Sequence, residues 1–106
     1  MPRLQEFVRT NPGEPDSLLY VFWCPGCGRH HLFDVGRTKR PVWTFNGDLE
    51  SPTFSPSLHY PDRCHLFLEA GLIRFLGDCR HALAGQTVPL PEIPPEDVWP
   101  NARREH

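Results

Sequence analysis

The chain has 106 residues, of which 39% are hydrophobic and 23% charged, and a formal net charge of −2. This length supports one hydrophobic core, so we expect a single domain over residues 1–106. The small net charge gives no overall field for a polyanion, which argues against nucleic acid as a partner. The sequence has no apolar run long enough to span a bilayer and no signal-peptide core, which predicts no membrane association and a cytoplasmic location.

The 13 prolines and 8 glycines argue against long helices and favour short strands joined by turns. We therefore expect a mainly β domain with little helix, built from hairpins and a sheet in the manner of a zinc ribbon. Residues 1–17 are polar and rich in turn formers, so we expect a loosely ordered lead-in.

The first strand signal is the apolar and aromatic run 18–23, which ends at a proline-glycine turn over 24–28. A strand-like pattern at 31–35 predicts the return strand, and 42–45 is the next strand candidate. Asn46-Gly47 predicts a turn, because both residues tolerate positive φ. In 53–58, Pro56 cannot donate to a ladder, so the segment is expected at a sheet edge or in an extended loop.

The clearest supersecondary signal lies further on, where two apolar runs, 64–69 and 72–76, flank Ala70-Gly71 and predict a β-hairpin. The Pro-rich tail 89–106 should be extended, apart from one helical turn beginning at Pro94-Pro95. The tail could pack Trp99 against the core or offer a polyproline II ligand, and packing or simple disorder is the preferred interpretation.

Cysteine spacing gives the strongest functional signal. Cys24-Pro25-Gly26-Cys27 is a turn in which two thiolates can converge on one metal ion, typical of zinc sites in a reducing compartment. The predicted hairpin brings Cys64-His65 at its start close to Cys79-Arg80-His81 at its end. The metal-ligand candidates are Cys24, Cys27, Cys64, Cys79, His65 and His81, and the expected cofactor is Zn²⁺.

These candidates exceed the four ligands that zinc requires. Adjacent residues of a strand face opposite ways, so Cys64 and His65 are not both expected on one ion. The preferred set is Cys24, Cys27, Cys64 and Cys79. A closed four-sulfur set would be structural, whereas an open set with histidines and a water would be catalytic. The alternatives left open are inert core cysteines and a redox pair. For His30, His31, His65 and His81 the alternative is a histidine that hydrogen-bonds a ligand or a backbone carbonyl, and for His30 it is preferred.

Other chemistry-bearing groups are weaker signals. Glu69, Asp78 and Asp34 are the acids best placed to serve a metal-bound water, Asp78 because it directly precedes Cys79, although accepting a backbone or histidine N–H explains Asp78 as well. The catalytic candidates are His65, Asp78 and His81. Serines 51, 55 and 57 near His59, with Asp48 and Asp62, supply the residue types of a nucleophilic triad, but no nucleophile-elbow motif fixes their geometry. The basic run Arg37, Lys39 and Arg40 could contact phosphate, although a solvated loop explains it as well.

Several motifs taken together resemble a known family. They are Cys-Pro-Gly-Cys at 24–27, Trp-Thr-Phe-Asn-Gly-Asp at 43–48, Pro-Thr-Phe-Ser-Pro-Ser at 52–57, Cys-His at 64–65 and Asp-Cys-Arg-His-Ala-Leu-Ala-Gly-Gln at 78–86. The chain is similar to small phage and prophage metal-binding proteins, some of which carry an ammonia monooxygenase label. The resemblance implies a metal-binding protein of phage origin, related to domains that accompany bacterial ubiquitin-like operons.

Two functional hypotheses follow. The first is a zinc-stabilised accessory protein that acts as an interaction module on a host or phage protein, with no reaction of its own. The alternative is a small zinc-dependent hydrolase, in which His65 and His81 join cysteines around an ion that carries a water and Asp78 acts as general base. If the chain is phage-encoded, its compartment is the host cytoplasm.

Overall fold

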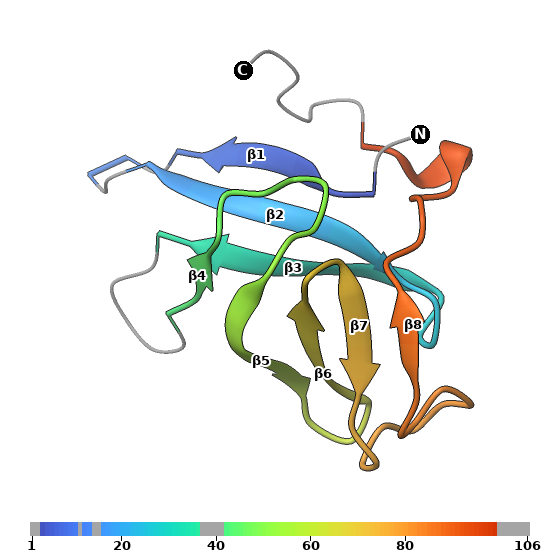
Figure 1. The fold of residues 1–106 in the computed structure, drawn as a ribbon. Coiled ribbons are helices and arrows are strands. Elements are labelled where there is room, and N and C mark those ends of the chain that lie inside the picture. Colours follow the sequence, from blue (N-terminus) through green and yellow to red (C-terminus); the bar gives the residue numbers. More distant parts are fainter. Residues whose placement is uncertain (1–2, 11, 14–15, 37–41, 100–106) are drawn as a thin grey trace.

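The computed structural model describes residues 3–10, 12–13, 16–36 and 42–99, which form two antiparallel sheets (Figure 1). The first sheet has the order β1-β2-β3, with β1 Gln5–Arg9, β2 Ser17–Cys24 and β3 Arg29–Val35. The second has the order β4-β5-β6-β7-β8, with β4 Thr44–Phe45, β5 Phe54–Tyr60, β6 Cys64–Glu69, β7 Leu72–Phe75 and β8 Thr87–Pro89. One 3-10 turn, η1 Pro95–Asp97, follows. The mainly β prediction is confirmed.

The first sheet is a hairpin with one added strand. The apolar run 18–23 lies within β2, which pairs with β3 across the predicted turn at 24–28. The lead-in differs from the expectation, because β1 pairs with β2 over five residue pairs, from Gln5 with Val21 to Arg9 with Ser17. Phe7 and Val8 supply a short β-forming segment there, and an existing strand edge is enough to order it.

The second sheet contains the predicted hairpin, with β6 and β7 paired from Leu66 with Phe75 to Glu69 with Leu72. The expectation for 53–58 was wrong in one respect: β5 lies between β4 and β6, not at the edge. Its pairing with β6 shifts register between Phe54 and Leu58, and Pro56 lies inside this irregularity. A proline is tolerated there because the ladder is already interrupted.

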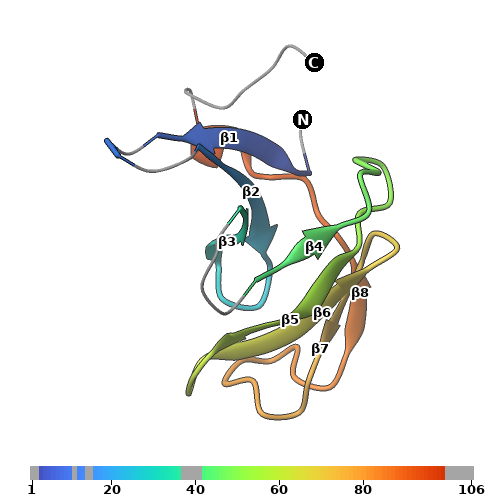
Figure 2. The ribbon, with the colours of Figure 1, turned by 90° about the vertical axis from the view of Figure 1, so that its left-hand side faces the viewer.

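The core lies between the two sheets, which face each other at an angle (Figure 2). Phe33 of β3 and Phe54 of β5 stack with ring centroids 4.2 Å apart and planes 1° apart. Tyr20 of β2 contacts Phe54 at 5.5 Å, and Phe75 of β7 is 1% exposed. These aromatic contacts join the sheets and fix the position of β5 and β6 relative to the β2–β3 hairpin.

The tail connects the second sheet back to the first. The predicted helical turn is present as η1, and Trp99 packs on Phe7 with ring centroids 4.9 Å apart. The Trp99 amide donates to Gln5 Oε1 at 3.0 Å, and Gln5 Nε2 donates to the Trp99 carbonyl at 3.2 Å. His30 Nε2 lies 2.6 Å from the carbonyl of Asp97. Of the two alternatives for Trp99, the structure shows packing.

Two expectations fall partly or wholly outside the described residues. The basic run Arg37, Lys39 and Arg40 and the tail beyond Trp99 belong to the ranges that the structure leaves undescribed. In the described part of the chain, no helix has the length and apolar character that a membrane crossing requires.

Candidate metal centre and catalytic residues

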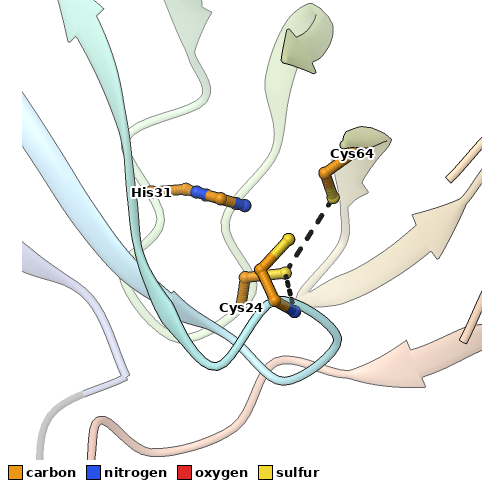
Figure 3. A group of neighbouring side chains, drawn as sticks. Cys24, His31 and Cys64 are labelled. Atoms are coloured by element: carbon orange, nitrogen blue, oxygen red, sulfur yellow. Dashed lines mark hydrogen bonds between the residues drawn. The ribbon is translucent and has the colours of Figure 1, made fainter. Parts of the chain in front are cut away.

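Three cysteine sulfurs meet where the two sheets approach each other (Figure 3). Cys24 ends β2, and the turn after it is closed by the Gly28 amide, which donates to the Cys24 carbonyl at 2.8 Å. Within this turn the Cys27 amide donates to Cys24 Sγ at 3.4 Å. Cys64 begins β6 on the other sheet, with its Sγ 4.0 Å from Cys24 Sγ. The cysteine turn and the hairpin base therefore converge, as the sequence predicted.

His31 points into the same group (Figure 3). Its Nδ1–H donates to the carbonyl oxygen of His30 at 2.9 Å, which leaves Nε2 as the nitrogen with a lone pair. His31 is 3% exposed, and its Nε2 is buried with no hydrogen-bond partner in the described structure. A metal-bound histidine usually has its second nitrogen hydrogen-bonded in this way. A metal ion would satisfy the orphaned nitrogen.

The ligand atoms of Cys24, Cys27, His31 and Cys64 all lie within 4.8 Å of one another and could hold a metal ion. We call these four residues the metal cluster. Cys24, Cys27 and Cys64 also belong to the four-cysteine set preferred from the sequence. His31 is the fourth residue of the metal cluster, whereas the sequence favoured Cys79 at that position. Three sulfurs and one nitrogen form a closed set suited to a tetrahedral ion.

The thiols of the metal cluster influence one another's ionisation. The hydrogen bond from Cys64 lowers the pKa of Cys24, and the same contact raises the pKa of Cys64. Burial raises the pKa of Cys27. The contact between Cys24 and Cys64 thus favours the thiolate of Cys24 and the thiol of Cys64. A bound cation would favour the thiolate form of Cys24, Cys27 and Cys64 together.

His81 lies beside the metal cluster in a different role. The Leu83 amide donates to His81 Nδ1 at 3.2 Å, so the proton of the neutral ring is on Nε2, which lies 3.5 Å from Cys64 Sγ. His81 therefore donates to the sulfur. Gly26 makes room for this ring, because a Cβ there would lie 2.2 Å from His81 Cε1.

Cys79 is close to the cluster, yet its sulfur is used elsewhere. It groups with Cys64 and His81, while its Sγ accepts from the His65 amide at 3.2 Å and donates to the His65 carbonyl at 3.1 Å. Cys79 thus holds both backbone groups of His65. The side chain of His65 faces away from Cys64, because adjacent strand residues alternate.

On that opposite face, His65 connects two further polar side chains. Ser57 Oγ of β5 lies 3.1 Å from His65 Nε2, and Asp78 Oδ2 lies 3.1 Å from His65 Nδ1. The hydrogen bond from His65 lowers the pKa of Asp78, which keeps its carboxylate ionised. Nδ1–H therefore donates to Asp78, and Nε2 accepts from the Ser57 hydroxyl. We call Ser57, His65 and Asp78 the relay.

The relay lies at the surface. The side chains of His65 and Asp78 are 24% and 56% exposed, and the His59 ring stacks on His65 with centroids 4.3 Å apart. Next to Asp78 is a hollow of about 400 Å³, which we call the relay hollow. It is lined by His59, Pro61, Asp62, Gly77, Asp78, Cys79 and Arg80. The hollow thus lies beside the Asp78 end of the relay, and Ser57 and His65 are not among its lining residues.

The sequence predicted His59 as the histidine near Ser57, with Asp48 or Asp62 as the acid. The structure pairs Ser57 with His65 instead, because β5 and β6 are in register at His59 with His65, which places Ser57 diagonally across from His65. Predicting that strand pairing would have found the relay. His65 and His81, which the zinc-hydrolase alternative combined, lie in separate groups: His65 with His59 and Asp78, His81 with Cys64 and Cys79.

Comparisons with known proteins give one result. The searches of curated proteins and of solved structures produced no match. A family model does match, over residues 3–76, which is more than half of the chain. Its description is that of the serine protease of a bacterial ubiquitination-like system. This agrees with the ubiquitin-like operons that the resemblance implied. The description includes neither phage origin nor an ammonia monooxygenase. The chain belongs to this family, BubE.

Proposed function

We propose that the protein is a serine peptidase whose reaction is carried out by the relay. The observation that carries the proposal is the Ser57–His65–Asp78 hydrogen-bond chain, with both nitrogens of His65 engaged in the order that a Ser-His-Asp triad requires. The family description names a serine protease, and Ser57 and His65 lie within the matched residues, with Asp78 two positions beyond.

The roles follow from the geometry. Ser57 Oγ forms a bond to the carbonyl carbon of the scissile peptide while its proton passes to His65 Nε2. His65 then gives that proton to the leaving amine as the C–N bond breaks, which leaves an acyl-enzyme on Ser57. Water, deprotonated by His65, releases the acid product and restores the Ser57 hydroxyl. Asp78 holds Nδ1–H and stabilises the imidazolium.

We propose that Zn²⁺ occupies the metal cluster in a structural role. The support is the donor set of three cysteines with His31 Nε2, together with the absence of any other partner for that nitrogen in the described structure. When bound, the ion fixes Cys64 to the β2–β3 hairpin. His65 follows Cys64 directly and is also held by Cys79, so the cluster supports the position of the proposed catalytic base.

The substrate class and compartment are also proposals. A peptidase of this family would act on a protein of the bacterial ubiquitination-like system, and the reduced cysteines suit a cytoplasmic location. The sequence-based hypothesis of a non-enzymatic interaction module stays a prediction. Among the described residues, no contact supports that hypothesis as directly as the relay supports the peptidase.

The test is labelling with a fluorophosphonate probe, which reacts with an activated serine, followed by peptide mapping. We expect one label, on Ser57, and loss of peptide and ester hydrolysis by at least about 10³-fold in Ser57→Ala. Ser55→Ala is the matched control, because Ser55 is an exposed serine of the same strand whose hydroxyl contacts Thr44 Oγ1 at 3.1 Å. It should keep both labelling and hydrolysis.

Two outcomes would contradict the proposal. Hydrolysis that survives in Ser57→Ala would remove Ser57 as the nucleophile. Hydrolysis that needs an added metal ion, in a protein where Ser57 is never labelled, would point instead to a metal bound by His59, His65 and Asp78, whose ligand atoms also lie within 4.8 Å of one another.

A further inference from the structure

Three arginines line a second hollow, on the outer side of the cysteine turn. Arg29 begins β3, Arg63 lies in the turn before β6, and Arg80 follows Cys79. The hollow has a volume of about 250 Å³, and its remaining lining residues are Gly26, Cys27 and His81. We call it the arginine hollow. Residues from three separate parts of the chain bring these positive charges together.

The charges in the arginine hollow are poorly compensated. Arg80 lies 3.7 Å from Asp62, but both side chains are mostly exposed, at 71% and 91%, so this pair contributes little. Within the described ranges, neither Arg29 nor Arg63 has an acidic side chain at ion-pair distance. The whole chain is slightly acidic, so three such arginines in one hollow do not reflect its general charge.

The arginine hollow adjoins the relay hollow. Arg80 lines both, and the relay hollow is also lined by His59 and Asp78. A peptide that lies in the relay hollow, beside Asp78, can therefore continue over Arg80 toward Arg29 and Arg63.

We propose that the arginine hollow binds an acidic side chain of the peptide substrate and so determines which peptides are cleaved. Guanidinium groups bind carboxylates through paired, charge-assisted hydrogen bonds, and the adjoining hollows suit a peptide that bears such a group. The inference rests on the proposed peptidase function for its role, but binding of the acidic peptide can be measured without catalysis.

The experiment uses fluorescein-labelled decapeptides in which one Glu is moved through a Gly/Ala background, each with a Gln twin. The fluorescence anisotropy of each peptide is titrated with Ser57→Ala protein, so that binding is measured without cleavage. The buffer contains about 0.15 M salt to screen non-specific electrostatic attraction. We expect at least one Glu peptide to bind about tenfold tighter than its Gln twin, and Arg63→Ala to abolish this difference. Arg74→Ala is the control, because Arg74 lies on β7 and is paired with Glu69 at 3.2 Å.

The outcomes separate the two proposals. If Glu and Gln peptides bind equally, or if Arg74→Ala removes the preference as Arg63→Ala does, the acidic-side-chain site is wrong. If the preference depends on Arg63 but the wild-type protein cleaves no peptide and takes no fluorophosphonate, the site stands and the peptidase function fails. A thermal melt of each arginine variant checks that it is folded. If Arg63→Ala does not fold, Arg29→Ala is measured in its place.

Discussion

Replacing His31 by phenylalanine tests the metal cluster, because its effect should depend on whether metal is bound. The aromatic ring keeps its contacts with Tyr60, at 4.5 Å, and Phe22, at 5.8 Å. In the metal-free protein the change removes a buried nitrogen that has no hydrogen-bond partner among the described residues, a gain of about 1–3 kcal/mol. It also removes the bond to the His30 carbonyl, a loss of about 0.5–1.5 kcal/mol. The metal-free stability should therefore change little or rise slightly.

In the zinc-loaded protein the same change removes a ligand and should be destabilising. Each tenfold loss of zinc affinity lowers the metal-linked stabilisation by about 1.4 kcal/mol at saturating metal. A hundredfold loss would therefore cost about 3 kcal/mol, a large part of the 5–15 kcal/mol that typically separates folded from unfolded protein. Urea unfolding with and without a chelator measures both values, and a chelator competition gives the zinc affinity.

Cys79→Ala is the matched control for the ligand set. If His31 completes the metal cluster, zinc affinity should survive in Cys79→Ala and fall in His31→Phe. The reverse pattern would refute our assignment and restore the set of four cysteines. Equal destabilisation of His31→Phe with and without metal would show that His31 only packs. Cobalt spectra of the two variants provide an independent measure, because loss of a thiolate and loss of an imidazole change the visible bands differently.

Three further predictions follow from the contacts. In steady-state assays Cys79→Ala should lower kcat more than it changes KM, because Cys79 Sγ holds the backbone of His65. Cys79→Ser keeps a hydrogen-bond donor and acceptor and should recover part of the lost kcat. Phe54→Ala should cost about 3–5 kcal/mol in urea unfolding, since Phe54 is 1% exposed between the sheets; a cost below 1 kcal/mol would contradict the packing. Trp99→Ala should lower the free energy of unfolding by about 2 kcal/mol, because a half-buried ring and its hydrogen bond to His30 Nδ1 are lost. An unchanged melting curve would show that the tail does not stabilise the fold.

Local patterns in the sequence were sufficient for several strands and for one half of the metal cluster. The apolar run at 18–23, the turn at 24–28 and the hairpin around Ala70-Gly71 are signals between near neighbours, and the structure contains all of them. Cys24 and Cys27 share a turn, so their convergence follows from spacing alone. The alternation of residues in a strand also correctly separated Cys64 from His65.

The tertiary structure decided which distant residues meet. Spacing alone does not distinguish His31 from Cys79 as the fourth residue of the proposed metal site, because that choice depends on the carbonyl that fixes the proton of His31 and on the backbone groups that contact Cys79. The relay depends on the register of β5 against β6, which a proline and a register shift hide from pattern reading. Strand composition determines that a segment is extended, but the packing of two sheets around a shared core determines its partner, and the proposed chemistry of this protein lies in those pairings.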